Sequence, residues 1–472
     1  MTAVGQNRAQ IFRSRPEAAT QDSPAKGKLP LAALLYLLMV LLPIGFELGP
    51  LYLTSLRLLL LVLFVPLMLQ LLLGRFGRLL WPDVLFFMHI AWTTVALGVN
   101  NPSMVIGNTG AAAIEFLGGY LVARATIRSK ADFIMLARWL GFLVCLTLPL
   151  ALIESQTGNA PILSFLERIP GLRTTKNFYM EPRMGLQRAQ VFLAHPIHYG
   201  LFCSSAFSLV VLALRDIIPN WQRLLMAGAV ALCVFLSLSS GAMLPLMVQM
   251  FLLVWIWVFH RLRRPWLPLV VLIMAAYIIV DLLSNRTPTM VFLSYATFSA
   301  HTAYWRAQIF EWGMINVWDN PIFGLGFNDW VRPYYMYSGS MDNFWLVMAV
   351  RYGIPGFLLV ALGFGIGLVR VMCRDFSGDP ALIQMRRAWI FTFIGLTLTL
   401  CTVHIWTTIY SFIFILFGAG MWLINAEPAT ALPQTAGKPD PVAAPGLPLG
   451  APRYTRFPVH KGTAIRQGSR TL

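Results

Sequence analysis

Long apolar runs alternate with short polar connectors along most of this chain. A helix needs about 20 apolar residues to cross a bilayer, and about twelve segments reach or approach that length. These segments lie near residues 30–48, 50–73, 80–98, 107–123, 132–153, 191–214, 222–239, 241–259, 266–283, 342–369, 388–403 and 405–424. The pattern predicts an all-α integral membrane protein with about twelve transmembrane helices.

The polar positions between the runs predict the topology. Lys and Arg concentrate in the N-terminal segment and in every second connector, which is the arrangement expected of cytoplasmic loops. We therefore expect a polytopic membrane domain at 30–424 with both chain termini in the cytoplasm. A basic segment, 1–29, precedes this domain. A tail rich in Pro, Ala and Gly follows at 425–472 and is expected to be disordered.

Two long polar segments then fall on the opposite, periplasmic face, at about 154–190 and 284–341. Connections longer than about 15 residues are commonly either functional or disordered. The second segment holds many Trp, Tyr and Phe residues, which are rare in disordered chains. We expect it to be structured, to contain short helices and to carry the chemistry of the protein together with the first segment.

Composition supports the membrane assignment and excludes other classes. Hydrophobic residues make up 57% of the chain and charged residues 12%, against roughly 25% charged in soluble domains. The net charge of +17 does not indicate nucleic-acid binding, because most of the basic residues stand between apolar runs. The five cysteines form no CxxC motif and no Cys/His cluster, so the sequence predicts neither a disulfide framework nor a metal site.

The first periplasmic segment ends in basic residues. Arg183 and Arg188, with Lys176, are expected at or above the outer membrane surface. A guanidinium suits a phosphate group, because it stays charged and donates two parallel hydrogen bonds; anchoring to lipid headgroups is the alternative. His195 follows, about one helical turn before His198, and we expect a packed, hydrogen-bonded role for each. His195 is in addition a candidate for substrate binding.

The second periplasmic segment combines aromatic residues with an arginine. Trp305 and Arg306 fall in a pattern that is typical of a short amphipathic helix lying on the bilayer. Turn signals follow, among them Gly324-Leu325-Gly326, which alone is weak support for phosphate binding. Tyr334 and its neighbouring tyrosines are either platforms on which sugars stack or part of an interfacial aromatic belt. Trp305 and Tyr334 are therefore candidates for substrate binding.

Asp342 begins a predicted span at the outer surface. A proton acceptor at that position could meet a substrate that arrives from both lipid and water. Asp is also a favoured helix N-cap residue, so a base and a cap are both open interpretations. Asn343 can take the capping function, which would allow the two roles to coexist, and it is a further candidate for substrate binding.

Charged residues inside the predicted spans are costly and often functional. Glu115, Arg57, Arg138 and Arg351 stand in such positions. A structural pair between Glu115 and an arginine and a catalytic role are both open.

Several short motifs follow one another between roughly residues 180 and 360. They are Arg188 before Val191-Phe192-Leu193-Ala194-His195-Pro196, then Leu238-Ser239-Ser240-Gly241-Ala242, then Arg306 with Trp312, then Pro321-Ile322-Phe323-Gly324-Leu325-Gly326, and last Asp342-Asn343 with Leu346 and Gly353-Ile354-Pro355-Gly356. In their order, spacing and placement relative to the spans, these motifs resemble the O-antigen ligase and polymerase superfamily of bacterial inner-membrane glycosyltransferases.

The resemblance implies polymerisation of lipid-linked repeat units at the periplasmic face of the inner membrane. An acceptor sugar hydroxyl would attack the anomeric carbon of a glycan carried on undecaprenyl pyrophosphate. Arg188 and Arg306, with Arg183 as a weaker candidate, would stabilise the leaving pyrophosphate. Asp342 would accept the hydroxyl proton. The resemblance implies no cofactor, nucleotide sugar or metal. It suggests membrane lipid, a flippase and a chain-length regulator as partners.

The acceptor separates the closest alternatives. Ligases of the superfamily usually carry His where this chain has Asp342, which favours a polymerase of an exopolysaccharide or O-antigen. A ligase would instead transfer the glycan to a lipid or protein acceptor. A polysaccharide or lipid transporter would bind its substrate near the bilayer midplane, whereas the charged and aromatic groups here concentrate in the external segments. A non-catalytic scaffold of an envelope assembly complex is the remaining alternative.

Overall fold

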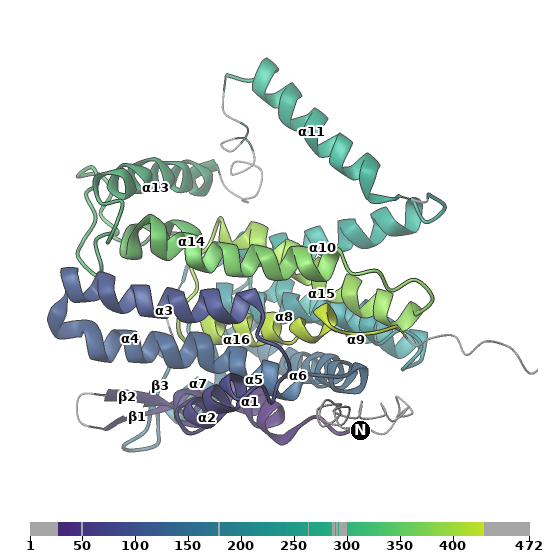
Figure 1. The fold of residues 1–472 in the computed structure, drawn as a ribbon. Coiled ribbons are helices and arrows are strands. Elements are labelled where there is room, and N and C mark those ends of the chain that lie inside the picture. Colours follow the sequence, from purple (N-terminus) through teal and green to yellow (C-terminus); the bar gives the residue numbers. More distant parts are fainter. Residues whose placement is uncertain are drawn as a thin grey trace, which may run out of the picture. The chain divides into compact units, whose positions relative to one another are not determined.

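The structure confirms the predicted fold class, an all-α integral membrane protein (Figure 1). The computed structural model describes residues 27–428 apart from 49–50, 178–179, 263, 286–287, 289–290 and 292–299. The protein is 70% helical, with very few residues in strands. The segment 1–26 and the tail from 429 onward, for which we expect a cytoplasmic location, lie outside the described residues.

The helices follow one another in the order of the apolar runs. They are α1 (Leu31–Leu41), α2 (Ser55–Leu72), α3 (Trp81–Asn100), α4 (Val105–Ala113), α5 (Gly119–Thr126), α6 (Lys130–Thr157), α7 (Pro161–Leu166), α8 (Pro196–Ser208), α9 (Asn220–Leu236), α10 (Ser240–Val258), α11 (Trp266–Leu283), α13 (Ala300–Asp319), α14 (Phe344–Met372), α15 (Pro380–Leu400) and α16 (Thr407–Gly418). Short π-helical turns at Ile114–Gly118 and Leu209–Ala213 join α4 to α5 and extend α8, and 3-10 turns lie at Pro102–Met104 and Met421–Ile424.

Nine helical segments in the described part of the chain are long and apolar enough to cross a membrane. They correspond to α2, α3, α4–α5, α6, α8, α10, α11, α14 and α16. Two further apolar helices, α1 and α9, are shorter. α15 has 21 residues, but Gln384, Arg386 and Arg387 make its first half polar. Each of the predicted segments therefore contains a helix, yet fewer of these helices than expected meet the length and hydropathy of a full span.

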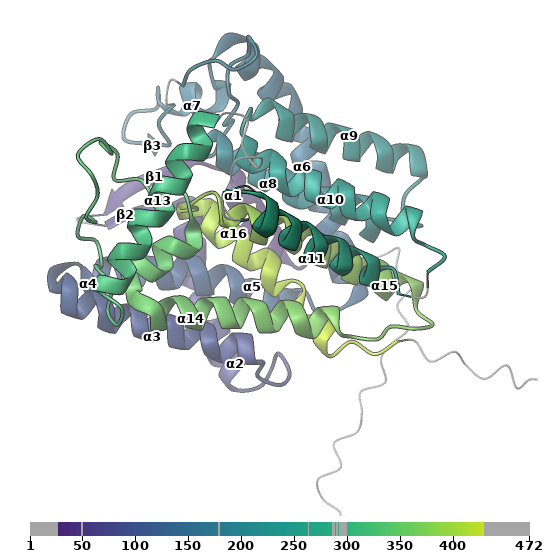
Figure 2. The same cartoon turned by 90° about the horizontal axis from the view of Figure 1, so that it is seen from above.

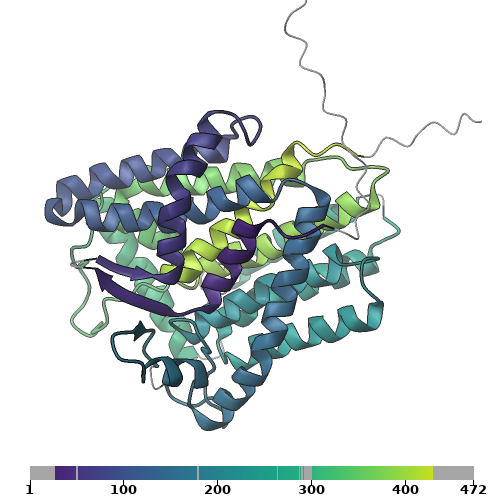
Figure 3. The same cartoon turned by 90° about the horizontal axis from the view of Figure 1, so that it is seen from below.

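The first predicted span, 30–48, is a short helix followed by a strand. α1 ends shortly before Pro43, because a proline disfavours the helical conformation at the residue preceding it. Its 11 residues extend about 16 Å, roughly half of a hydrocarbon core. Strands β1 (Ile44–Leu48) and β2 (Leu51–Thr54) then form an antiparallel hairpin. β3 (Arg173–Thr174) pairs with β1, so the strand order is β2-β1-β3 (Figure 3).

Two helices occupy the interior of the bundle. In the most apolar stretch of the α8 segment 89% of the residues are buried, and in that of the α16 segment 78%. α8 packs against α6, α9, α10 and α15. α16 packs against α5 and against the π-helical turn Ile114–Gly118 that precedes α5. α3 lies along α14 (Figure 2). In α11 only Leu269 is buried, and an otherwise exposed apolar helix of this kind is expected to face lipid.

Polar elements gather at one end of the bundle, which we call the loop end. It carries the three strands, α7 and α13 (Figure 1). α13 crosses over the beginning of α14 (Figure 2), and these two helices are in contact. The described parts of the two long polar segments, 154–190 and 284–341, thus lie at the same end. Their periplasmic location stays a prediction.

The charges inside the spans are largely paired. Arg57 Nε lies 2.7 Å from Glu115 Oε1. This is the structural pair between Glu115 and an arginine that the sequence left open. Arg124 donates from Nε and Nη2 to the two carboxylate oxygens of Asp83, each at 3.0 Å. Asp83 is fully buried and also accepts a hydrogen bond from the Tyr120 hydroxyl. Buried pairs of this kind fix neighbouring helices, because removing one partner leaves the other charge uncompensated.

Candidate functional site

α13 places a buried arginine at the loop end. Arg306 is 7% exposed, and neither its Nε nor its Nη1 has a hydrogen-bond partner among the described residues. Burial lowers the pKa of Arg306; the nearby carboxylate of Asp342 opposes this shift, and the Arg183 guanidinium adds to it. Buried arginines are nearly always paired, so this side chain is a candidate for binding an anion.

An anchored loop leads into α8. Glu154, near the end of α6, accepts the N–H of Gln190 through Oε1 at 2.9 Å and the N–H of Val191 through Oε2 at 2.8 Å. Val191 has φ 55°, a left-handed conformation that is costly for a β-branched residue. The Glu154 carboxylate therefore holds a strained turn. Residues 187–191, which we call the anchored loop, are fixed to the end of α6 in this way.

The anchored loop carries Arg188. Its Nε is buried and has no hydrogen-bond partner in the described part of the chain. Burial, with a further contribution from Arg183, lowers the pKa of Arg188 to about 10, so the side chain stays charged at neutral pH. It lines a cavity of about 170 Å³ with Glu154 and Gln187. Arg183 is exposed, and its Nη1 donates to the carbonyl oxygen of Leu238 at 2.9 Å.

His195 has a structural role at the start of α8. It is the N-cap residue, and its Nδ1 accepts the N–H of Ile197 at 3.1 Å. Burial, then Arg188 and then Arg183 lower the pKa of His195 to about 4, so its ring is neutral at pH 7. This geometry agrees with the packed, hydrogen-bonded role that the sequence predicts. The ring also lies within electrostatic reach of both arginines.

Asn343 caps α14, and Asp342 does not. The Asn343 side chain accepts the N–H of Leu346 at 3.1 Å. Asp342 is half-buried, and its Oδ1 accepts a hydrogen bond from the hydroxyl of Ser340 at 3.4 Å. Asn343 therefore takes the capping role, and the Asp342 carboxylate stays within electrostatic reach of the Arg306 guanidinium.

A glycine brings α10 and the connector between α15 and α16 to the same place. The N–H of Phe344 donates to the carbonyl oxygen of Val403 at 3.0 Å. A Cβ added to Gly241 would lie 2.5 Å from Val403 Cγ1, and 3.7 Å from Arg306 Nη2. Only glycine allows this approach. The Leu238–Ala242 motif of the sequence therefore packs next to Val403 and the Arg306 guanidinium.

The Gly-x-Gly motif docks onto a break in α14. Gly353 has φ 71° and ψ 177°, so the helix is interrupted there. The N–H of Leu325 donates to the carbonyl oxygen of Val350 at 2.7 Å, and the N–H of Gly326 donates to that of Arg351 at 2.9 Å. Gly326 has φ 62°, a conformation that favours glycine. Backbone docking explains the motif without a phosphate.

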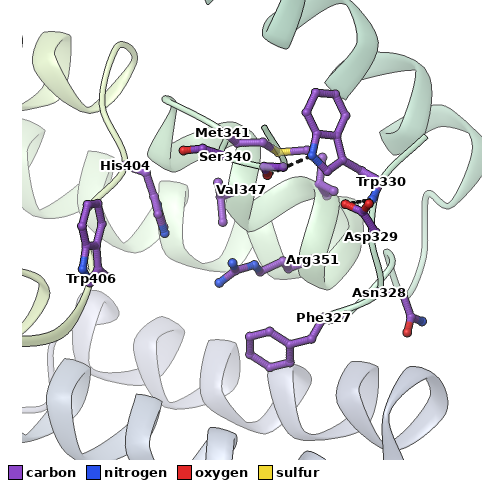
Figure 4. A pocket seen from close by; sticks show the side chains of 13 residues that line it. Phe327, Asn328, Asp329, Trp330, Ser340, Met341, Val347, Arg351, His404 and Trp406 are labelled. Atoms are coloured by element: carbon purple, nitrogen blue, oxygen red, sulfur yellow. Dashed lines mark hydrogen bonds between the residues drawn. The ribbon is translucent and has the colours of Figure 1, made fainter. Parts of the chain in front are cut away.

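A cavity of about 470 Å³ opens beside this junction (Figure 4). We call it the 326–341 cavity. It is lined by residues 326–330 and 339–341, by Val347, Val350 and Arg351 of α14, and by His404 and Trp406 of the α15–α16 connector. A smaller cavity of about 230 Å³, the α3–α4 cavity, shares Phe327, Arg351, His404 and Trp406 with it. The two cavities are therefore adjacent.

The sequence reasoning missed His404 and Trp406. Burial, and then the charge of Arg351, lowers the pKa of His404 to about 3, so the ring is neutral. Its Nδ1 is buried without a hydrogen-bond partner in the region that the structure describes. The available signal was a polar break between two apolar runs, and this break is short enough to be taken for a simple turn.

The two aromatic candidates lie outside both cavities. Tyr334 is 90% exposed, with its ring 5.8 Å from that of Tyr335. The ring of Tyr335 is 6.3 Å from that of Trp305, which is half-buried on α13. The three rings form a surface group beside Arg306 rather than a wall of the 326–341 cavity.

Residues 224–361 match the family model described as O-antigen ligase. This part of the chain is therefore similar to the O-antigen ligase family. The predicted resemblance to the O-antigen ligase and polymerase superfamily is thereby confirmed. The matched segment contains Gly241, Arg306 and Asp342, whereas Arg183 and Arg188 precede it. No curated protein matches the chain.

The match to the O-antigen ligase family supports the general class of the protein. Together with the apolar helices it identifies a multi-pass membrane protein of polysaccharide biosynthesis. The family implies glycosyl transfer of the ligase or polymerase type in general, with lipid-linked glycans as substrates and membrane lipid as a partner.

The conformation of the anchored loop should depend on the carboxylate of Glu154. A glutamine at this position keeps the shape but has only one acceptor oxygen, so Glu154→Gln leaves one of the two backbone N–H groups unpaired. Amide hydrogen exchange at Gln190 and Val191 should accelerate by about ten- to a hundred-fold, as expected for the loss of a hydrogen bond to a charged group. Glu167→Gln, an exposed glutamate in the same polar segment, should leave both rates unchanged. Unaltered exchange in Glu154→Gln would show that the carboxylate does not hold the turn.

Proposed function

We propose that the protein polymerises oligosaccharide repeat units carried on undecaprenyl pyrophosphate, at the periplasmic face of the bacterial inner membrane, in exopolysaccharide or O-antigen synthesis. The observation that carries this proposal is the electrostatic interaction between Asp342, which does not cap α14, and Arg306, a buried cation that keeps N–H groups without a partner in the described chain. The match to the O-antigen ligase family supports the class of reaction.

The arginines suit the leaving group. Breaking the bond between the anomeric carbon and the pyrophosphate builds negative charge on the phosphate oxygens. Preorganised donors aimed at such developing charge are often the largest catalytic contribution. Arg306 and Arg188 each keep at least one N–H without a partner among the described residues, and Arg183 adds positive charge beside both. We assign the pyrophosphate to Arg306 and Arg188, with a weaker contribution from Arg183.

An apolar groove next to Arg306 suits the lipid. This α13–α14 groove has a volume of about 590 Å³ and is lined by α13, α14 and α15. Phe310, Met314 and Val317 of its wall stand on the same face of α13 as Arg306, given the spacing of helical neighbours. A polyprenyl chain in the groove would therefore place its charged head at the guanidinium.

Asp342 suits the proton transfer. The acceptor sugar hydroxyl attacks the anomeric carbon, a new glycosidic bond forms, and the bond to the pyrophosphate oxygen breaks. The hydroxyl proton passes to the Asp342 carboxylate, and the bonding electron pair leaves with the lipid pyrophosphate. Because Asn343 caps α14, the carboxylate is not engaged by the helix terminus. Positioned bases of this kind contribute roughly 100- to 10,000-fold.

The remaining assignments follow the topology expected from the sequence. We place both termini, including 1–29 and 425–472, in the cytoplasm, and the segments 154–190 and 284–341 in the periplasm. The gathering of the described parts of these two segments at the loop end supports this orientation. Trp305, Tyr334, His195 and Asn343 are proposed to border the substrate. A flippase and a chain-length regulator are proposed as partners.

A ligase is the second candidate, because the matched family is described as O-antigen ligase. The same donor chemistry would serve a ligase, and only the acceptor differs. Asp342 stands where ligases of the superfamily usually carry His, which favours the polymerase.

A purified-component assay tests the proposal. The protein in detergent receives an undecaprenyl-pyrophosphate oligosaccharide as its only substrate, and the products are separated on a gel. A ladder of added repeats is expected, because the donor itself supplies the energy of the bond. Transfer only when a lipid core or another acceptor is added would identify a ligase. Absence of transfer in both assays would exclude both enzymes and favour the transporter.

Arg306→Gln should abolish the ladder without destabilising the protein. Losing the donor to the leaving group should reduce turnover by about 100- to 1,000-fold. Because the substitution also removes a buried, poorly compensated cation, the thermal midpoint in detergent should stay equal or rise. Arg168→Gln, an exposed arginine in the first polar segment, should keep wild-type turnover. A lowered thermal midpoint that accounts for the lost activity would point to a structural arginine.

Asp342→Asn should distinguish a role of Asp342 as a base from a role in capping α14. Turnover should fall by roughly 100- to 10,000-fold, while the thermal midpoint should not move because Asn343 remains the cap. Asp319→Asn makes the same change at an exposed position on α13 and should be silent in both measurements. Wild-type turnover in Asp342→Asn would remove this carboxylate from the mechanism.

A further inference from the structure

The 326–341 cavity begins immediately beside the proposed base. Ser340 and Met341 line it, and the Ser340 hydroxyl donates to Asp342. Arg306 lies on α13, whereas the cavity lies against α14 and the α15–α16 connector. Asp342 thus has two kinds of neighbour: Arg306, which it influences electrostatically, and the cavity, which Ser340 and Met341 line. The volume of about 470 Å³ is typical of a small-molecule site.

The charge in the 326–341 cavity is positive. Arg351 forms no ion pair with any carboxylate that the structure describes. The carboxylates of the two cavities are already engaged: Glu115 with Arg57 at 2.7 Å, and Asp329 with Arg332 at 2.5 Å. The guanidinium of Arg351 stands above the ring of Phe327, 5.0 Å from its centroid, and projects into the cavity (Figure 4). An anion entering here would meet one uncompensated positive charge.

Two further polar groups lack partners within the described chain. His404 Nδ1 and Thr93 Oγ1 are buried without a hydrogen bond, and Thr93 is 1% exposed on the wall of the α3–α4 cavity. Buried polar atoms are normally satisfied, so unpaired ones facing a cavity indicate a ligand with hydroxyl or carbonyl groups. Trp406 and Phe327 add aromatic rings shared by both cavities. Polar atoms beside aromatic rings suit a sugar.

We propose that the 326–341 cavity and the adjoining α3–α4 cavity form the acceptor subsite of the reaction, and that they select a sugar carrying a carboxylate, which Arg351 binds. This inference rests on the proposed function, because it names the acceptor for the same Asp342. Trp406 and Phe327 would border the sugar ring, and His404 and Thr93 would bond to its hydroxyls. The sugar hydroxyl beyond Ser340 would then reach Asp342.

The test compares two acceptor probes on the full chain in lipid nanodiscs. One probe is a disaccharide containing glucuronate, and the other is the same disaccharide with its carboxyl group reduced to hydroxymethyl. Binding is measured without donor by isothermal titration. The wild-type protein should bind the glucuronate form about ten- to a hundred-fold more tightly, as expected of a hydrogen bond to a charged group. Equal affinities, or no binding of either probe, would overturn the inference.

Variants of Arg351 assign the preference to this residue. Arg351→Gln should abolish the difference between the two probes, and Arg351→Lys should retain part of it. Arg370→Gln makes the same change on the same helix at an exposed position in its last turn and should behave as wild type. A preference that persists in Arg351→Gln would overturn the inference.

Transfer assays keep the two proposals distinguishable. In Arg351→Gln the KM for an acidic acceptor should rise, with kcat and the KM for a neutral acceptor unchanged. If this variant instead raises the KM for a lipid pyrophosphate donor carrying only neutral sugars, Arg351 serves the pyrophosphate and the subsite is wrong. If the wild type prefers the acidic probe in binding and yet transfers no glycan, the proposed function fails while the sugar subsite stands. If the wild type forms a ladder but shows no preference for the acidic probe, the proposed function stands while the acidic-sugar subsite fails.

Discussion

Positive charge that the protein buries without full compensation is the constraint on which the loop end depends. Transferring a cation from water into a folded protein is costly unless it gains a partner. Arg306 and Arg188 nevertheless keep N–H groups unpaired in the described chain. The surrounding contacts hold them there: the Glu154 carboxylate fixes the anchored loop, and Gly241 lets α10 approach the connector. Interactions elsewhere in the bundle must offset the cost of this arrangement.

In the proposed reaction, two sets of elements would serve Asp342. The first set is the arginines of α13 and of the anchored loop, together with the apolar α13–α14 groove. The second set is the lining of the 326–341 cavity. A transferase must hold donor and acceptor in a fixed relation, because orientation supplies a large part of the rate. Here the relation is set by the contact between the start of α14 and Val403.

The sequence predicted the helices well, because apolar runs of span length leave few alternatives. It failed at 30–48, where Pro43 ends the helix and a hairpin pairs with distant β3. The loop arginines could be singled out because charge is rare in this chain. The sequence could not predict whether Asp342 or Asn343 caps α14, because this depends on the local backbone geometry of two adjacent residues. His404 and Trp406 were missed because they join the site only through contacts with residues distant in sequence.

The interruption of α14 at Gly353 has a mechanical consequence. Backbone hydrogen bonds from Leu325 and Gly326, and that from Ile354 to Pro321, bridge the break, so the tilt of the part of α14 before Gly353 is set by a loop and not by helix stiffness. That part carries Arg351 and begins beside Asp342, and the bridging loop follows directly from α13. A displacement of α13 by a lipid chain would therefore move Asp342 and Arg351 together. Binding of the lipid-linked donor would therefore also change the alignment of the acceptor.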